Sequence, residues 1–262
     1  MPRPITATLH LGAFENNLQV VRRCAPSAKV WSVVKANAYG HGIKHVWRSM
    51  AQTDGFALLD LAEAIMLRES GWQGPILLLE GFFKAQDLAL LDRYRLTTSV
   101  HSDWQLAAIA EAKLSAPLDV YLKVNSGMNR LGFQPEEMPA VRRELALTPS
   151  IGAITLMTHF AEADGGRGID WQVERFRRVL ADWPEAAGFP VSMDNSAAML
   201  RYPKTTGDWV RPGLILYGGS PFTDEDAASL GLKPVMTLES RILAVQEIRT
   251  GERIGYGGDF VA

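Results

Sequence analysis

The stretch Val33-Val34-Lys35-Ala36-Asn37-Ala38-Tyr39-Gly40-His41-Gly42 decides how the chain is interpreted, because an apolar run ends in a lysine and passes at once into a polar loop with glycines. The β-branched and aromatic residues up to Val34 predict a buried strand. Lys35 would then lie at the carboxyl end of this strand, facing a crevice. A partly desolvated amine favours its neutral form, which suits Schiff-base chemistry with an aldehyde. The alternative is an ordinary solvated lysine in a loop.

Composition narrows the class of protein. A chain of 262 residues with 47% hydrophobic content can bury the core of one large α/β barrel or of two smaller domains. The formal net charge of −2 and the lack of a sustained basic run argue against nucleic acid or an anionic membrane as the main partner. Cys24 is the only cysteine, so an internal disulfide cannot form. Residues 1–11 lack a signal-peptide pattern and the apolar runs are too short to span a bilayer, so we expect a cytoplasmic protein.

Strand-like and helix-like stretches alternate along most of the chain. Ile5 to Leu9 resembles an edge strand, and Leu11 to Cys24 has the spacing of an amphipathic helix. Eight strand candidates follow, at residues 29–34, 55–59, 75–80, 97–100, 119–125, 154–160, 190–195 and 213–217, with helical segments such as 61–70 and 170–182 between them. This order predicts a (β/α)8 barrel of the TIM type. A doubly wound sheet is the alternative, but the chain has no G-x-G-x-x-G fingerprint.

Polar residues gather at the predicted carboxyl ends of the strands, where such barrels place their active sites. These residues are Lys35, Lys123, His159, Asn195, Ser196 and Arg211. Taken singly, each has an ordinary reading. Lys123 would be an outward strand residue, His159 a satisfied core histidine and Arg211 a member of a surface ion pair.

After Tyr217 the sequence changes character. Residues 235–248 alternate like antiparallel strands, and a turn-rich stretch follows at 251–258. We expect residues 11–220 to form the barrel and residues 221–262 to begin an all-β domain, with which the strand within residues 1–10 associates.

The lysine-containing stretch resembles the cofactor-lysine motif of bacterial alanine racemases, especially of the catabolic branch. Further stretches resemble the same family in the same order: Leu122-Lys123-Val124-Asn125-Ser126-Gly127-Met128-Asn129-Arg130, Met157-Thr158-His159-Phe160-Ala161, Asp208-Trp209-Val210-Arg211-Pro212-Gly213 and Gly255-Tyr256-Gly257-Gly258. The resemblance runs to Ala262. It implies a barrel followed by the beginning of the family's C-terminal β domain, whose later residues, including a Met-Asp pair and a phosphate-binding tyrosine, have no counterpart.

The resemblance implies an isomerase that depends on pyridoxal 5'-phosphate and interconverts L-alanine and D-alanine, as a source of a peptidoglycan precursor or in amino-acid catabolism. Racemisation needs two bases on opposite faces of the α-carbon. Lys35 would carry the cofactor and serve the D-alanine face, and Tyr256 the L-alanine face. A phenol with a pKa of ~10 would need nearby cations to stabilise its phenolate. Without the resemblance, Tyr256 reads equally as a turn tyrosine.

The resemblance also assigns residues around the cofactor. Arg211 would face the pyridine nitrogen, to which an arginine cannot readily give a proton, and His159 would support Arg211. The phosphate would be held by Tyr39, Asn195, Ser196 and the backbone N–H groups of Gly213 and Leu214. No residue is expected to bind a metal.

Arg130 would lie near the substrate carboxylate and the phenolic oxygen of the cofactor. Lys123 is its expected neighbour, and carbamylation of this lysine, as in the family, would turn a repelling cation into an anion that holds Arg130. The family assembles as a head-to-tail homodimer in which each site borrows Tyr256 from the partner. Because Tyr256 lies close to Ala262, we expect the chain as given to hold cofactor but to racemise alanine more slowly than a full-length relative.

Two other classes remain as alternatives. Single-barrel proteins that bind pyridoxal phosphate and manage its supply without turnover share the fold, the lysine and this chain length. The segment Arg211-Pro212-Gly213 and the Tyr256 loop belong to the racemase pattern instead. A fold-related decarboxylase would have an acid in place of Arg211. The choice between alanine and serine as substrate stays open.

Overall fold

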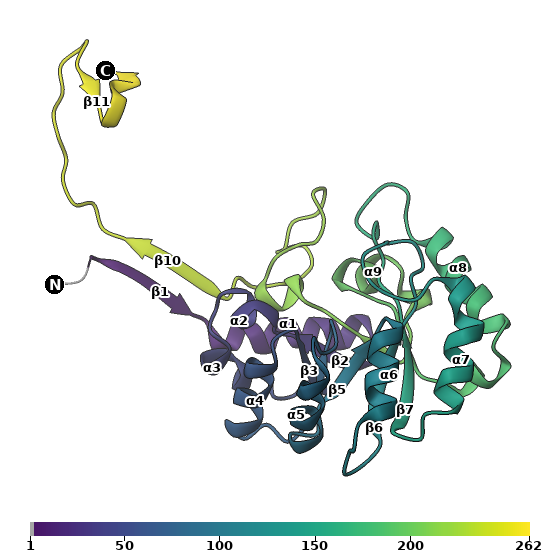
Figure 1. Cartoon of the computed structure of the whole chain (residues 1–262). Helices are drawn as coiled ribbons and strands as arrows, with labels where there is room; N and C mark the ends of the chain where they lie inside the picture. Colours follow the sequence, from purple (N-terminus) through teal and green to yellow (C-terminus); the bar gives the residue numbers. More distant parts are fainter. Residues whose placement is uncertain (1–2) are drawn as a thin grey trace. The chain divides into compact units, whose positions relative to one another are not determined.

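A computed structural model describes residues 3–262 (Figure 1). Contacts divide the chain into two compact units. The larger unit is Leu9–Val235, and the smaller one joins the N-terminal residues up to Thr8 with Met236–Ala262. Residues 221–235, which the sequence assigns to the start of a second domain, thus belong to the barrel unit. The reason is apolar burial, since Phe222, Leu232 and Val235 are almost completely buried in its core.

The larger unit is built on parallel strands that are hydrogen-bonded in the order β8-β7-β6-β5-β4-β3-β2-β9 within the described residues. The strands are β2 (Lys29–Val33), β3 (Gly55–Leu58), β4 (Ile76–Leu78), β5 (Thr97–Val100), β6 (Leu118–Lys123), β7 (Ile151–Met157), β8 (Val191–Ser192) and β9 (Trp209–Val210). The two end strands are linked as well, because Ser192 Oγ donates to the Trp209 carbonyl at 2.9 Å and the Arg211 N–H donates to the Asp194 carbonyl at 2.9 Å. The predicted (β/α)8 barrel is confirmed.

The position of the last strand was predicted wrongly. Residues 213–217 form a short 3-10 helix, η6 (Leu214–Tyr217), and the eighth strand is Trp209–Val210. Pro212 explains the difference, because it has no N–H for a sheet ladder and ends the strand. As a result, Arg211 follows the eighth strand directly and lies at its carboxyl end.

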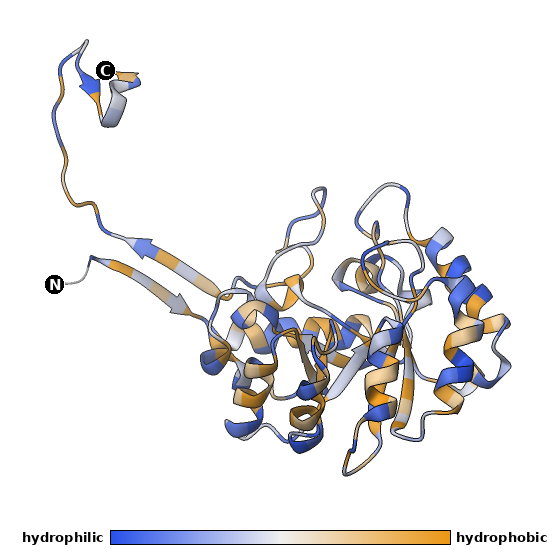
Figure 2. Cartoon of the chain, in the orientation of Figure 1, coloured by the Kyte–Doolittle hydropathy of each residue, from blue (hydrophilic) through white to orange (hydrophobic). Residues whose placement is uncertain are grey.

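An α-helix lies in every crossover from β2 to β9. The α-helices are α1 (Leu11–Cys24), α2 (Lys35–Tyr39), α3 (Ile43–Val46), α4 (Leu61–Glu69), α5 (Leu88–Arg93), α6 (Asp103–Glu111), α7 (Met138–Ala146), α8 (Asp170–Ala181) and α9 (Ser196–Arg201), with short 3-10 segments between them. Figure 2 shows hydrophobic and hydrophilic residues alternating along α7 and α8. In α7 the apolar Val141 and Leu145, four residues apart, are buried. Each such helix therefore covers the barrel with one face.

Two apolar layers separate the inside of the barrel from its outside. Val30 of β2 and Val34, which follows β2, belong to the large cluster beneath the helices. Trp31 and Val33 of β2 belong to a smaller cluster with residues from β3, β4, β6 and β7. This alternation follows from the two-residue period of a strand. Within the smaller cluster, Trp31 stacks on Trp209 with ring centroids 4.5 Å apart. The barrel interior is thus a packed core and not an open channel.

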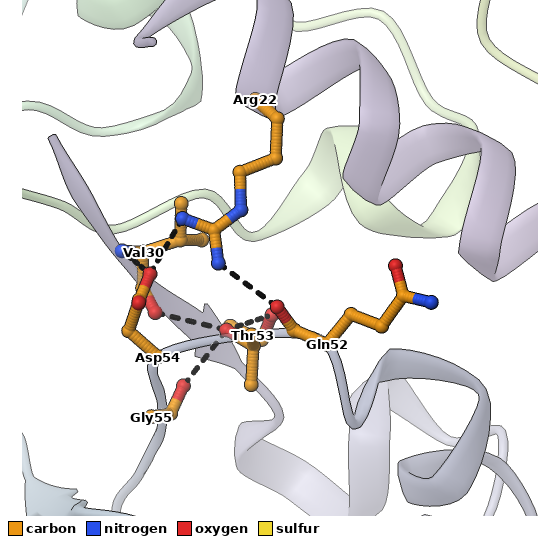
Figure 3. A network of polar contacts seen from close by, with 7 residues as sticks. Arg22, Val30, Gln52, Thr53, Asp54 and Gly55 are labelled. Atoms are coloured by element: carbon orange, nitrogen blue, oxygen red, sulfur yellow. Dashed lines mark hydrogen bonds and ion pairs between the residues drawn. The ribbon is translucent and has the colours of Figure 1, made fainter. Parts of the chain in front are cut away.

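A polar network anchors the start of β2, the strand that leads to Lys35 (Figure 3). The Asp54 carboxylate accepts the Val30 N–H at 2.8 Å and pairs with Arg22 of α1 at 2.6 Å. The Thr53 hydroxyl lies 2.8 Å from the Val30 carbonyl and 3.1 Å from the Gly55 carbonyl. These bonds tie α1, β2 and β3 together, so the strand register below Lys35 is held from both sides.

The smaller unit consists of short β segments. The predicted edge strand at the N-terminus is confirmed as β1 (Ile5–Leu9), which pairs with β10 (Met236–Ser240). Regular strand structure occupies only this first part of residues 235–248. Further on, β11 (Arg253–Ile254) pairs antiparallel with β12 (Phe260–Val261), and η7 (Tyr256–Gly258) lies between them. Apolar side chains of this unit, such as Ile242 and Val245, are more than 80% exposed.

In the part of the chain that the structure describes, no helix has the length and apolar content to cross a membrane.

Candidate active site

A cavity of about 300 Å³ opens where the barrel strands end. It is lined by every site residue that the sequence predicts in the barrel: Lys35, Tyr39, Lys123, Arg130, His159, Asn195, Ser196, Arg211, Gly213 and Leu214. These residues come from segments spread over 180 positions of sequence, from Lys35 to Leu214. Their convergence is the feature that the barrel topology predicts, because parallel strands bring their carboxyl ends to one mouth.

Lys35 begins a left-handed turn that the sequence did not predict. Ala36, Asn37 and Ala38 have φ and ψ values of 50–54°, and Tyr39 has φ 52°. Such a conformation costs L-residues ~1–2 kcal/mol each. The turn is held by side chains, since Glu63 Oε1 accepts the Asn37 N–H at 2.7 Å and Asn37 Oδ1 accepts the Ile43 N–H at 2.9 Å. Backbone strain of this kind, next to a candidate nucleophile, is typical of functional sites.

Tyr39 is oriented by a second tyrosine. Its ring stacks on that of Tyr217 with centroids 4.5 Å apart, and the Tyr217 hydroxyl donates to the Val33 carbonyl at 3.1 Å. The Lys35 Nζ lies 6.0 Å from the centre of the Tyr39 ring. Burial raises the pKa of Tyr39. The phenol therefore stays protonated at neutral pH and can donate a hydrogen bond to an anion in the cavity.

Arg211 is 5% exposed, and both terminal nitrogens of its guanidinium donate hydrogen bonds. It donates to Ser192 Oγ at 2.6 Å, to the Thr158 carbonyl at 2.7 Å and to the Met193 carbonyl at 3.2 Å. Burial lowers the pKa of Arg211 to about 10, while Asp194 and then Tyr121 act to raise it. Arg211 is thus a cation at neutral pH, held in one orientation by fixed acceptors.

His159 contacts Arg211 directly, with Nδ1 at 3.2 Å from a guanidinium nitrogen. Burial, followed by the charges of Arg211 and Lys123, holds the pKa of His159 well below its usual value. The imidazole is therefore neutral. A neutral imidazole can accept a hydrogen bond from the guanidinium at Nδ1, and we assign the tautomer on that basis.

Ser196 follows β8 and Gly213 follows β9, and both residues line the cavity. The Gly213 N–H donates to Ser196 Oγ at 3.0 Å. A Cβ atom at position 213 would overlap the Tyr39 hydroxyl, so a larger residue here would displace that hydroxyl. The hydroxyls of Tyr39 and Ser196 and the backbone at Gly213 and Leu214 therefore line the same part of the cavity. Asn195 supports this arrangement as the cap of α9, because its Oδ1 accepts the Ala198 N–H at 3.0 Å.

Lys123 is 7% exposed at the end of β6. Burial lowers its pKa to about 8, and the charges of Arg211 and Arg130 act in the same direction. A substantial fraction of this lysine is therefore neutral at slightly alkaline pH. Arg130 lines the same cavity but is exposed. The turn that brings Arg130 back depends on Asn125, whose Oδ1 accepts the N–H groups of Gly127 and Asn129 at 2.9 and 3.1 Å.

Several residues around the cavity were missed by the sequence reasoning. Ser192 binds Arg211, Glu63 holds the turn after Lys35, and Asp194 is buried and accepts the Arg211 N–H through its carbonyl. Glu80 and Asp164 line the opening. Ser192 and Asp194 lie at or just after the end of β8, so the strand-end rule that found Asn195 could also have found them. For Glu63 no local signal exists, because its partner Asn37 is 26 residues away.

Tyr256 belongs to the smaller unit and is fully exposed there, within η7. The cavity of the barrel unit is formed without it. Its assignment as second base stays a prediction. Across residues 3–262, no cluster of three or more His, Cys, Asp or Glu side chains is arranged to hold a metal ion.

The (β/α)8 barrel has a packed interior, and its mouth holds a lysine, a buried arginine and a group of hydrogen-bond donors that can bind an anion. Such a site suits an enzyme that acts on small molecules. Comparison with known proteins defines the class further. Residues 9–221 match the model of the alanine racemase N-terminal domain. The chain is 57% identical over 259 residues to the catabolic alanine racemase of Klebsiella aerogenes and 58% identical over 261 residues to that of Salmonella typhimurium. The two alignments include 98% and 99% of this chain, and each includes 72% of the relative's length.

Solved structures agree with this result. The crystal structure of the biosynthetic alanine racemase from Pseudomonas aeruginosa superposes with a TM-score of 0.93 at 40% identity, over all of this chain and 73% of that one. The alanine racemase of Acinetobacter baumannii superposes with a TM-score of 0.91 at 34% identity. The chain therefore belongs to the alanine racemase family, and the family resemblance predicted from its motifs is confirmed. Neither comparison supports the alternative of a single-barrel binding protein.

Proposed function

We propose that the protein interconverts L-alanine and D-alanine with pyridoxal 5'-phosphate as its cofactor. The observation that carries this proposal is the convergence of Lys35, Arg211 and the Tyr39–Ser196–Gly213 corner in one cavity of the barrel unit. When bound, pyridoxal phosphate supplies an electron sink that weakens the Cα–H bond of an amino acid. Everything else in the reaction depends on where this chain places its own groups.

The residues present fit this cofactor. The corner at Gly213 offers the hydroxyls of Tyr39 and Ser196 and the Leu214 N–H, which suit a phosphate, while the Gly213 N–H, which donates to Ser196 Oγ, would orient that hydroxyl. Arg211 would meet the pyridine nitrogen as a hydrogen-bond donor. Since its pKa stays near 10 even when buried, it remains a cation and does not release its proton to the ring. A ring kept unprotonated is a weaker electron sink, which limits side reactions.

Lys35 would bind the aldehyde of the cofactor and, once substrate replaces it, act as the base on the D-alanine face. The turn at Ala36–Tyr39 fixes the backbone on both sides of this amine, because Tyr217 holds Val33 and Glu63 holds Asn37. For the L-alanine face we propose Tyr256, supplied by the partner subunit of a head-to-tail homodimer. Proton transfer by positioned groups of this kind contributes ~100- to 10,000-fold to a rate.

We propose that Lys123 carries a carbamate that holds Arg130 for the substrate carboxylate. An unmodified Lys123 is a buried amine beside Arg211 and Arg130, and this setting lowers its pKa to about 8. The neutral amine attacks the carbon of CO₂ and loses a proton, which leaves an anion. That anion removes the repulsion and can pair with the guanidinium of Arg130.

In a cell, this activity would supply D-alanine as a peptidoglycan precursor or return it to amino-acid catabolism. The names of the two catabolic relatives favour the second role. We propose a cytoplasmic location, which places the enzyme with its free amino-acid substrates.

Two measurements test the proposal. Borohydride treatment of the protein with pyridoxal phosphate should leave the pyridoxyl group on the peptide that contains Lys35, and Lys35→Ala should abolish the labelling. Recovery on another lysine would overturn the assignment. A coupled D-amino-acid oxidase assay with L-alanine then measures racemisation, and labelling of Lys35 with no detectable racemisation would refute the proposed activity of this chain.

A further inference from the structure

Asp194 is a buried carboxylate that the proposed reaction does not use. It follows β8, and its side chain is fully buried. Among residues 3–262, neither of its carboxylate oxygens makes a hydrogen bond of normal geometry, although the Thr206 hydroxyl lies close enough to favour the ionised form. A buried, unpaired carboxylate is costly, since it has lost its hydration without gaining a partner. Its presence therefore calls for a compensating interaction.

The surroundings identify Arg211 as that interaction. Three successive residues face it: Ser192 through its hydroxyl, Met193 through its carbonyl, and Asp194 through its carbonyl, which accepts the Arg211 N–H at 2.9 Å. All the hydrogen bonds that the described chain provides to the guanidinium end on neutral groups. The cations Lys35, Lys123 and Arg130 line the same cavity. Arg211 thus has neutral hydrogen-bond partners, cations in the same cavity, and one buried acid, Asp194, in backbone contact with it.

We propose that Asp194 is a positioning residue that supplies the counter-charge of Arg211 and keeps its guanidinium charged and aimed at the ring nitrogen of the cofactor. The part concerning the ring rests on the proposed function, while the pairing of the two charges does not. The attraction acts without a direct hydrogen bond, because in a buried setting charges interact over longer distances than in water. The Thr206 hydroxyl, whose oxygen is buried, adds a neutral polar group that also favours the ionised carboxylate.

The expected ionisation agrees with this role. Burial raises the pKa of Asp194 to about 6, and both Thr206 and Arg211 act to lower it. Asp194 is therefore ionised at pH 8. In return, its charge raises the pKa of Arg211 against the effect of burial.

The first test uses the protein without cofactor and measures melting temperatures at pH 8 in a double-mutant cycle of Asp194→Asn and Arg211→Met. Asp194→Asn should lower the melting temperature when Arg211 is present, and should raise it or leave it unchanged in the Arg211→Met background, where the carboxylate has lost its counter-charge. Asp164→Asn is the matched control, because Asp164 lines the same cavity but is exposed. Equal shifts by Asp194→Asn in both backgrounds would overturn the pairing.

The second test measures the dissociation constants of pyridoxal phosphate and of its 1-deaza analogue, which has C–H in place of the ring nitrogen. Asp194→Asn should weaken pyridoxal phosphate binding by ~10-fold, equivalent to one charge-assisted hydrogen bond, and the analogue by much less. Equal weakening of both would mean a purely structural role and refute the positioning role. If the unmutated protein binds neither compound, the proposed function is wrong, and so is the orientation of Arg211 toward the ring. The double-mutant cycle of melting temperatures still decides whether Asp194 and Arg211 are paired.

Discussion

Ala36→Gly should stabilise this protein, which is the opposite of the usual effect of glycine. Ala36 has φ and ψ of 52°, in a region that costs an L-residue with a Cβ ~1–2 kcal/mol. Glycine removes this cost but gives the unfolded chain more freedom, which costs ~0.4–1 kcal/mol. Ala36 is exposed, so no packing is lost. The net expectation is a gain of ~0.5–1 kcal/mol in the free energy of unfolding, combining these two effects.

The assay is urea unfolding followed by tryptophan fluorescence, which reports on the barrel unit because all seven tryptophans lie between Trp31 and Trp209. A matched control is Ala107→Gly, at an exposed position of the right-handed helix α6. This control should lose ~1 kcal/mol, the usual penalty of glycine in a helix. In thermal unfolding, ~1 kcal/mol corresponds to ~2–4 °C for a domain of this size. If Ala36→Gly destabilises the protein as much as Ala107→Gly does, the left-handed turn after Lys35 is not the conformation in solution.

Three further predictions concern the groups around the cavity. Glu63→Ala should increase hydrogen exchange at residues 36–43, because the Asn37 N–H loses its acceptor, whereas Glu63→Gln keeps an oxygen acceptor and should exchange as the unmutated protein does; equal exchange in all three proteins would contradict the role of Glu63. Arg211→Glu should change the visible spectrum of the bound cofactor with substrate and slow racemisation, because an acid at this place favours a protonated ring; an unchanged spectrum and rate would count against the contact with the ring nitrogen. Unmodified Lys123 has a folded-state pKa of about 8, below the ordinary lysine value of 10.5, so the unfolded chain binds more protons between these pH values and stability should rise as pH rises from 8 to 10.5. Urea unfolding in CO₂-free buffer measures this rise, which should disappear in Lys123→Met.

The sequence predicted the principal residues of the site, but not their protonation states. Lys35, Lys123, His159 and Arg211 were predicted from motifs and from their places at strand ends, and the structure brings them together. The protonation states of these groups could not be predicted. The pKa of Lys123 falls to about 8 because of burial and of two arginines that lie 7 and 88 positions further along the chain. Such effects depend on neighbours that only the folded chain provides.

By itself, the sequence determined the alternation of strands and helices, the barrel and the family, because these depend on local periodicity and on short motifs that each lie within a few residues. The helix Leu11–Cys24 and the edge strand Ile5–Leu9 were predicted with the bounds that the structure has. Only the tertiary structure decided that the eighth strand precedes Pro212, that Ala36–Tyr39 turn left-handed under the hold of Glu63, and that Asp194 is buried in backbone contact with Arg211. These features depend on contacts between distant segments, whose burial and charge no local pattern records.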